Sequence, residues 1–181
     1  MAVVNEGIAG NRLLGDGPIG SFGVSALARF DRDALSIPGV THIVLLEGIN
    51  DLGFPGARLG ELALADRAQV RTAEDLIAAY RQLISRAHAR GVRVIGCTIT
   101  PSQGFVIPGY YSEAKEATRQ AVNEWIRTSH EFDGAIDFDA VLRDPAQPSR
   151  LLPRLASGDH LHPNDAGYQA MANAIDLALF E

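Results

Sequence analysis

Three apolar, strand-like runs alternate with helical segments along this chain, and this alternation limits the possible folds more than any other feature. The runs are residues 41–47, 92–99 and 134–138. Apolar residues recur at helical spacing over residues 72–90 and 112–130. A continuous apolar run is typical of a parallel strand that is covered on both faces. We therefore expect an α/β protein, a three-layer α/β/α fold with a mainly parallel, flavodoxin-like sheet.

The remaining segments are expected to be shorter and more irregular. The apolar stretch Val3-Val4-Asn5 is typical of the last residues of a strand, and residues 21–35 could carry a short helix. Residues 50–70 read as a long irregular connection. A length of 181 residues and 46% hydrophobic content suffice for one core, so we expect a single domain over residues 1–181.

Composition argues against several classes of function. The net charge is −6, and no Lys/Arg cluster is present that could neutralise phosphates, so nucleic acid is not an expected partner. No apolar run approaches the roughly 18 residues needed to span a bilayer. The single cysteine, Cys97, lies in an apolar run and is expected to be a buried, unreactive thiol. The compartment is not indicated.

Candidate functional residues follow the predicted strands and precede the last helix. In parallel sheets, sites lie beyond the carboxyl ends of the strands, and residues 5–10, 48–51 and 100–104 all occupy such positions. Further along, Asp159 stands three residues before His162, and Asp165 could cap a final helix. A carboxylate that orients an imidazole is half of a nucleophilic hydrolase.

Three sequence blocks together resemble those of a known family. They are Asn5-Glu6-Gly7-Ile8-Ala9-Gly10-Asn11, Gly48-Ile49-Asn50-Asp51 and Asp159-His160-Leu161-His162-Pro163. In order and context they resemble the second, third and fifth blocks of the SGNH hydrolases, also called GDSL esterases and lipases. The resemblance runs from Val3 to the end of the chain.

The resemblance implies an activity and a role for each of four residues. The Gly10 backbone N–H and the Asn50 side-chain amide would form an oxyanion hole. His162 would be the general base, and Asp159 would hold its tautomer and stabilise the imidazolium. The implied reaction is ester hydrolysis, by acyl transfer to a serine and then to water, without metal or cofactor. The substrate could be an acetyl, short acyl, lipid or sugar ester.

The family's first block, a Gly-Asp-Ser-like motif with the nucleophilic serine, is not found. We therefore expect a chain that is N-terminally incomplete relative to the family, lacking the first strand and with an unknown nucleophile. Ser102 is the least implausible substitute, because it follows a strand at the active-site end. The gap in the sheet would be filled by exchange of elements with a second copy, by a separate N-terminal piece, or by a shifted sheet.

Other interpretations remain open. The family fold could serve as a non-catalytic ligand-binding module, or the chain could be a flavodoxin-like nucleotide-binding domain. The Gly-x-Gly-x-x-Gly pattern of residues 15–20 lacks a complete preceding strand, which favours a plain loop. Asp159, His160 and His162 could be metal ligands, although no further ligand cluster is visible. Asp51 is expected to anchor its loop through backbone N–H groups. Apolar residues of two long loops could line an acyl pocket or cover the core: Phe54, Phe105, Ile107, Tyr110 and Tyr111.

Overall fold

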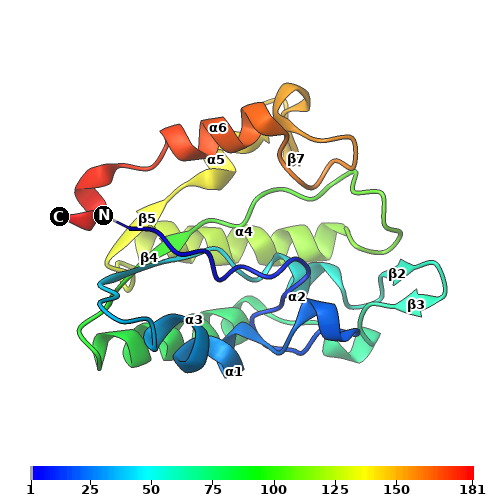
Figure 1. Ribbon diagram of the computed structural model, residues 1–181. Coiled ribbons are helices and arrows are strands. Elements are labelled where there is room, and N and C mark those ends of the chain that lie inside the picture. Colours follow the sequence, from blue (N-terminus) through cyan, green and yellow to red (C-terminus); the bar gives the residue numbers. More distant parts are fainter. Residues whose placement is uncertain (1) are drawn as a thin grey trace.

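A three-stranded parallel sheet forms the middle layer of the computed structural model, which describes residues 2–181 (Figure 1). The strands are β1 (His42–Leu45), β4 (Arg93–Cys97) and β5 (Gly134–Ile136), in the order β1-β4-β5. The helices α3 (Ala73–His88) and α4 (Glu113–Thr128) cover one face, and α6 (Asp165–Asn173) covers part of the other. The predicted α/β/α fold with a parallel sheet is confirmed.

The central strand β4 is buried from Val94 to Cys97, which explains the apolar sequence of these positions. Val94 and Ile95 point to opposite faces because side chains alternate along a strand, and both are fully buried. Val94 belongs to the core beneath α3 and α4, whereas Ile95 packs with Ile136, Met171 and other residues on the α6 side. A strand that is buried on both faces has no position at which a polar side chain would be favourable.

The long helices begin at capping residues. The Thr72 hydroxyl accepts a hydrogen bond from Asp75 N, and Asp75 accepts one from Thr72 N, which is a complete capping box at the start of α3. Ser112 caps α4 in the same way through Lys115 N. Both helices end two residues before their predicted ends, at His88 and Thr128.

Shorter elements surround these layers. The segment predicted as a short helix contains α1 (Ala26–Phe30) and a π-helical turn (Asp31–Leu35). The others are α2 (Ile49–Gly53), α5 (Phe138–Leu142), two hairpins, β2 (Arg58–Leu59) with β3 (Leu62–Ala63) and β6 (Arg143–Asp144) with β7 (Gln147–Leu151), and the 3-10 turns Gly20–Phe22, Arg67–Gln69, Pro153–Leu155 and Leu177–Phe180.

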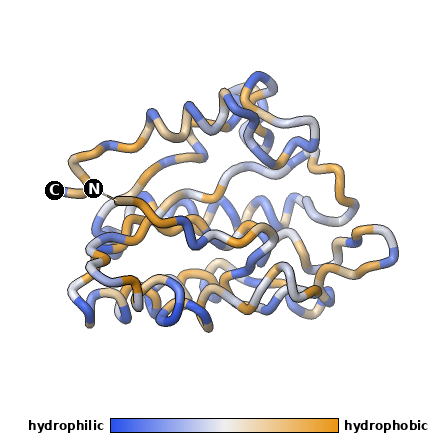
Figure 2. The backbone as a smooth tube through the Cα atoms, viewed as in Figure 1, coloured by the Kyte–Doolittle hydropathy of each residue, from blue (hydrophilic) through white to orange (hydrophobic). Residues whose placement is uncertain are grey.

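Three local predictions are wrong. Residues 50–70 are not irregular, because α2 and the β2–β3 hairpin occupy them, and Gly60 at φ 59° allows the tight turn between the strands. Asn164, not Asp165, caps α6 through Gly167 N. Val3 and Val4 belong to no strand and are 84% and 57% exposed. Figure 2 shows this N-terminal segment as a hydrophobic stretch running over the surface.

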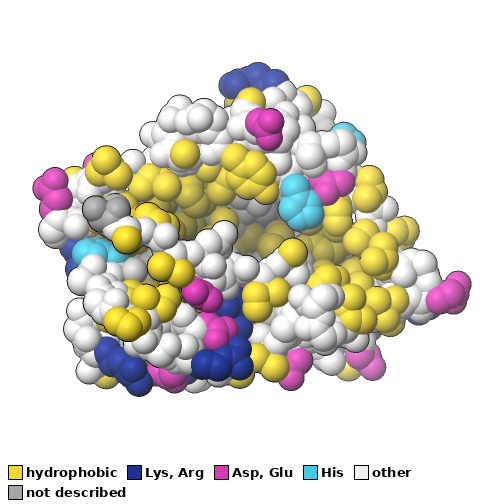
Figure 3. Space-filling model, viewed as in Figure 1, with side chains coloured by type: hydrophobic (Ala, Val, Ile, Leu, Met, Phe, Trp, Pro, Cys, Tyr) yellow, Lys and Arg dark blue, Asp and Glu magenta, His cyan; other side chains and the backbone are white. Residues whose placement is uncertain are grey.

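Strand β1 has an open edge. It pairs with β4 on one side, and within residues 2–181 no strand pairs with its other side. Val44 lies in register with Ile95, so it points to the sheet face that α6 covers elsewhere, yet it is 46% exposed. Leu46, two residues on, is 42% exposed. Figure 3 shows a hollow bordered by hydrophobic side chains across the middle of the molecule. No helix in the described part of the chain is both long and apolar enough to cross a membrane.

Candidate active site

Asp159 and His162 lie in contact on one tight turn. An isolated bridge between Ala156 and Pro163 closes the base of the turn, and His160 adopts a left-handed conformation at its tip (φ 64°). His162 Nδ1 lies 2.6 Å from Asp159 Oδ2. The other carboxylate oxygen accepts hydrogen bonds from Leu161 N, His162 N and Ser157 Oγ. The turn therefore holds the carboxylate in place against the imidazole.

The charge state of Asp159 determines the tautomer of His162. Partial burial opposes ionisation, but hydrogen bonds from His162, Ser157 and two backbone N–H groups outweigh it and lower the pKa of Asp159 well below its usual range. An ionised carboxylate only accepts hydrogen bonds, so Nδ1 of His162 is the donor and Nε2 carries the free lone pair. No hydrogen bond to Nε2 occurs within residues 2–181, and the side chain is 61% exposed.

The Asn50 side chain contacts the residue that follows Gly10, which forms a second part of the site. Asn50 follows Gly48, which has a φ of 111°, in the first turn of α2. Its Nδ2 donates to the carbonyl of Asn11 at 2.8 Å, which places the amide beside the residue next to Gly10. The Gly10 N–H donates to no acceptor among the described residues. Gly10 has a φ of 79°, and a Cβ atom there would lie 2.5 Å from the Phe22 ring, so only glycine fits.

Aromatic residues of the 100–111 loop lie between Asn50 and His162. The Tyr110 hydroxyl donates to Asn50 Oδ1 at 2.8 Å. Phe105 packs edge-on against Tyr110, with ring centroids 4.7 Å apart, and edge-on against His162 at 6.3 Å. The oxyanion-hole candidates and the imidazole are thus linked through Phe105 and Tyr110, which the sequence left open between pocket lining and core cover.

Asp51 accepts hydrogen bonds from backbone N–H groups, as predicted, but it anchors the segment after Gly10 and not its own, which is helical. Its carboxylate is fully buried and accepts hydrogen bonds from Leu13 N at 2.6 Å and Leu14 N at 2.9 Å. The guanidinium of Arg12 lies 3.9 Å from it. Burial raises the pKa of Asp51, although these hydrogen bonds act in the opposite direction. Its oxygens are occupied within the protein, which is the arrangement of a structural residue.

Two charged residues behind the site were not singled out from the sequence. Arg29 donates through Nε to Asn11 Oδ1 and through a terminal nitrogen to the Glu6 carbonyl. The same guanidinium lies 3.5 Å from Glu47 Oε1. Burial raises the pKa of Glu47 to about 7, although Arg29 opposes the shift. The sequence did offer a signal for Glu47, because its carboxylate ends an otherwise apolar run of residues.

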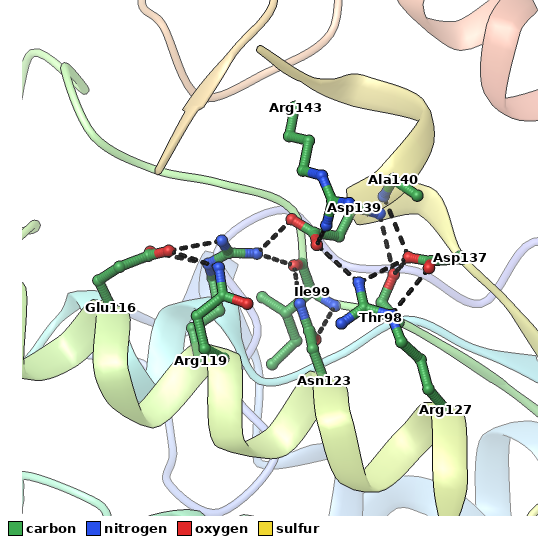
Figure 4. A network of polar contacts seen from close by, with 11 residues as sticks. Thr98, Ile99, Glu116, Arg119, Asn123, Arg127, Asp137, Asp139, Ala140 and Arg143 are labelled. Carbon is green, nitrogen blue, oxygen red and sulfur yellow. Dashed lines mark hydrogen bonds and ion pairs between the residues drawn. The ribbon is translucent and has the colours of Figure 1, made fainter. Parts of the chain in front are cut away.

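A buried ion network holds the carboxyl end of β4, where the 100–111 loop begins (Figure 4). Asp139 is fully buried and accepts hydrogen bonds from Arg119, Arg127 and Arg143 at 2.7, 2.6 and 2.9 Å. Arg119 and Asn123 also donate to the carbonyl of Ile99. The sequence analysis missed this network, although Arg119 and Asn123 stand on the apolar stripe of α4 with Val122 and Ile126.

The single lysine of the chain joins two loops near the site. Lys115 Nζ donates to four carbonyls, of Gly53 and Pro55 on one side and of Gly109 and Tyr110 on the other, at distances of 2.7–3.2 Å. The 100–111 loop is thereby tied to the chain that leaves α2.

No serine hydroxyl within residues 2–181 forms a hydrogen bond to His162. Ser102 is buried, and Ser157 donates to Asp159 instead of the imidazole. Across the same part of the chain, no group of three or more His, Cys, Asp and Glu side chains could hold a metal ion. In the glycine-rich segment, Gly17 N donates to the Gly23 carbonyl, and no strand precedes the segment. Cys97 is buried, as predicted, and burial raises its pKa to about 12.

Comparison with known proteins gives a family and a fold. The GDSL-like Lipase/Acylhydrolase family profile matches residues 1–170. A GDSL-like lipase from Bacteroides thetaiotaomicron superposes with a TM-score of 0.64 at 18% identity, covering 85% of this chain and 68% of that one. A member of the lipolytic protein G-D-S-L family from Veillonella parvula gives 0.52 at 18% identity, covering 82% and 69%. None of the curated proteins searched matches the chain.

Proposed function

Because the chain belongs to the GDSL-like lipase/acylhydrolase family, we propose that its site cleaves carboxylic esters, with a serine nucleophile supplied from outside residues 2–181. The observation that carries this proposal is the 2.6 Å contact between Asp159 and His162 Nδ1, which leaves Nε2 unpartnered and exposed. An imidazole held in this way is a general base that lacks only a hydroxyl to deprotonate.

In the proposed reaction, His162 Nε2 takes the proton of the serine hydroxyl as its oxygen attacks the ester carbonyl carbon. The Gly10 N–H and the free N–H of the Asn50 amide donate to the resulting oxyanion, which is usually worth 10²–10³ in kcat per donor. The C–O bond to the alcohol then breaks, and the alcohol leaves with the proton from His162. Water repeats the sequence on the acyl-serine and releases the carboxylic acid. Asp159 stabilises the imidazolium throughout.

The open edge of β1 supports a docking place for the nucleophile. A strand added there would pair with backbone groups of β1, and a helix following it would cover Val44 and Leu46. A small hollow of about 70 Å³, bordered by Leu46, Ile49 and Thr100, lies at the carboxyl end of the same strand. We propose that a Gly-Asp-Ser-bearing strand and helix, supplied by a separate N-terminal piece, occupies this edge.

The proposal is tested by supplying that element. A designed strand, Gly-Asp-Ser turn and helix is fused upstream of the chain, and release of p-nitrophenol from its acetate ester is measured. We expect turnover in the fusion that is lost with His162→Ala and retained with His130→Asn. His130 is a matched control because it is exposed, lies just beyond the end of α4 and adopts a φ of 57°, which asparagine tolerates.

Two results would contradict the proposal. Serine-reagent-sensitive turnover by the chain without the fused segment would place the nucleophile among its own serines. A folded fusion that binds the ester without cleaving it would favour the second candidate, a non-catalytic binding module. That candidate is kept because no serine hydroxyl reaches His162 within the described residues.

A further inference from the structure

A second, larger hollow lies on the other side of the turn that carries Asp159 and His162. Its volume is about 440 Å³, within the roughly 300–1,000 Å³ typical of small-molecule sites. The 103–104 loop, the β6–β7 hairpin, the turn after β7 and residues 156–160 surround it. Its polar lining consists of Gln103, Asp144, Gln147, Arg150, Ser157 and His160.

The charged groups of this hollow are not used to hold the fold together. The Arg150 side chain forms no ion pair or hydrogen bond within the described part of the chain, and neither does the His160 ring. Asp144 accepts one hydrogen bond, from Ala146 N, and has no cationic partner among residues 2–181. In the network around Asp139, by contrast, each charged side chain faces an opposite charge. The free groups of the hollow are therefore available to a ligand.

The composition of the lining indicates a neutral, polyhydroxylated ligand. One guanidinium and one carboxylate nearly cancel, so neither an anion nor a cation is favoured overall. Guanidinium, carboxylate and amide groups each present two donors or acceptors in one plane, which matches adjacent hydroxyl groups. Leu151, Pro153 and Ala156 add an apolar surface against which the C–H groups of a sugar ring can pack.

We propose that this hollow binds the sugar part of a sugar ester, which deepens the proposed esterase function and rests on it for the ester bond. Ser157 connects the hollow to the Asp159–His162 pair. It lines the hollow, and its Oγ donates to Asp159 at 2.6 Å while its N–H donates to the His162 carbonyl at 2.8 Å. Gly104, which also lines the hollow and lies beside His160, precedes Phe105, whose ring packs against His162. The hollow therefore borders the two segments that hold the imidazole, the turn of Asp159 and the start of the 100–111 loop.

Sugar binding is measured without turnover, so that an inactive chain still tests the inference. Methyl hexopyranosides are titrated into the ¹⁵N-labelled chain, with octanoate as the acyl-chain probe. We expect saturable shifts of the Gln103, Ser157 and His160 amides with at least one hexopyranoside and none with octanoate. Arg150→Met and Asp144→Asn should each weaken the binding about tenfold or more, since each removes a charge-assisted hydrogen bond.

Arg154→Met is the matched control, because Arg154 is an exposed arginine of the neighbouring 3-10 turn that does not line the hollow. The inference is overturned if no hexopyranoside gives saturable shifts, if octanoate produces them instead, or if Arg154→Met weakens binding as much as Arg150→Met. Failure of ester cleavage in the fusion protein, with sugar binding intact, would contradict the proposed function alone.

Discussion

Replacing Asp139 by asparagine tests whether the buried ion network holds the end of β4. The substitution keeps the shape of the side chain but removes its charge and turns one acceptor oxygen into a donor. That NH₂ group would then face arginine N–H groups in a site with no exposure to water. Arg119, itself only 1% exposed, would keep Glu116 and the Ile99 carbonyl as partners but lose its buried carboxylate.

The expected cost follows from burial. Breaking a buried ion pair from one side typically costs about 3–5 kcal/mol, because the remaining charge stays buried without compensation. Arg143 reaches the same carboxylate but is 38% exposed, so Arg143→Met should cost no more than about 1 kcal/mol. With a urea m-value of roughly 2 kcal/mol per M, these costs correspond to midpoint shifts of about 1.5–2.5 M for Asp139→Asn and at most about 0.5 M for Arg143→Met.

The single tryptophan reports on the transition. Trp125 lies on α4 and stacks on Tyr80 with ring centroids 6.0 Å apart, so its fluorescence changes when the helix leaves the core. Urea unfolding of the chain and the two variants therefore measures the shifts directly. If Asp139→Asn moves the midpoint no further than Arg143→Met, the reasoning from burial is wrong.

Three further predictions concern titratable groups and the loops. The pKa of Glu47 is raised to about 7, so its neutral form contributes stability that is fully present below pH 4.5 and is lost as pH rises through 7. The urea midpoint of Glu47→Gln should therefore fall less between pH 5 and 8 than that of the unmodified chain. The depressed pKa of Asp159 contributes stability above about pH 4 that is lost on further acidification, so Asp159→Asn should flatten the acid limb of the same profile, and an unchanged limb would contradict the prediction. Lys115→Met removes the donor to four carbonyls, so amide hydrogen exchange should accelerate in residues 53–57 and 105–111 but not in β4.

The sequence predicted what depends on short-range patterns. The parallel strands follow from apolar runs, of which β4 is buried on both faces, and α3 and α4 follow from helical periodicity and the caps at Thr72 and Ser112. The contact between Asp159 and His162 was also accessible, because both residues lie within a single turn. Each of these features needs only information from neighbouring positions.

The features that were missed depend on partners far apart in the chain. Arg119 and Asp139 pair across 20 residues, and Arg29 reaches both Glu6 and Glu47. Val3 and Val4 were predicted to be in a strand but are not. Their β propensity alone does not form a strand without a neighbouring strand to pair with. The β2–β3 hairpin was overlooked because Gly60 was the only clear turn signal between two-residue strands.

The position of Lys115 also determines how the chain reacts with reagents that modify amines. Apart from the chain terminus, its Nζ is the only primary amine in the sequence, and it is surrounded by carbonyl oxygens of two loops. Only a deprotonated amine that has left those oxygens can attack an acylating reagent. The rate at which Lys115 is acylated therefore depends on how often the two loops beside the imidazole separate. Measuring this one modification reports the frequency with which the site opens.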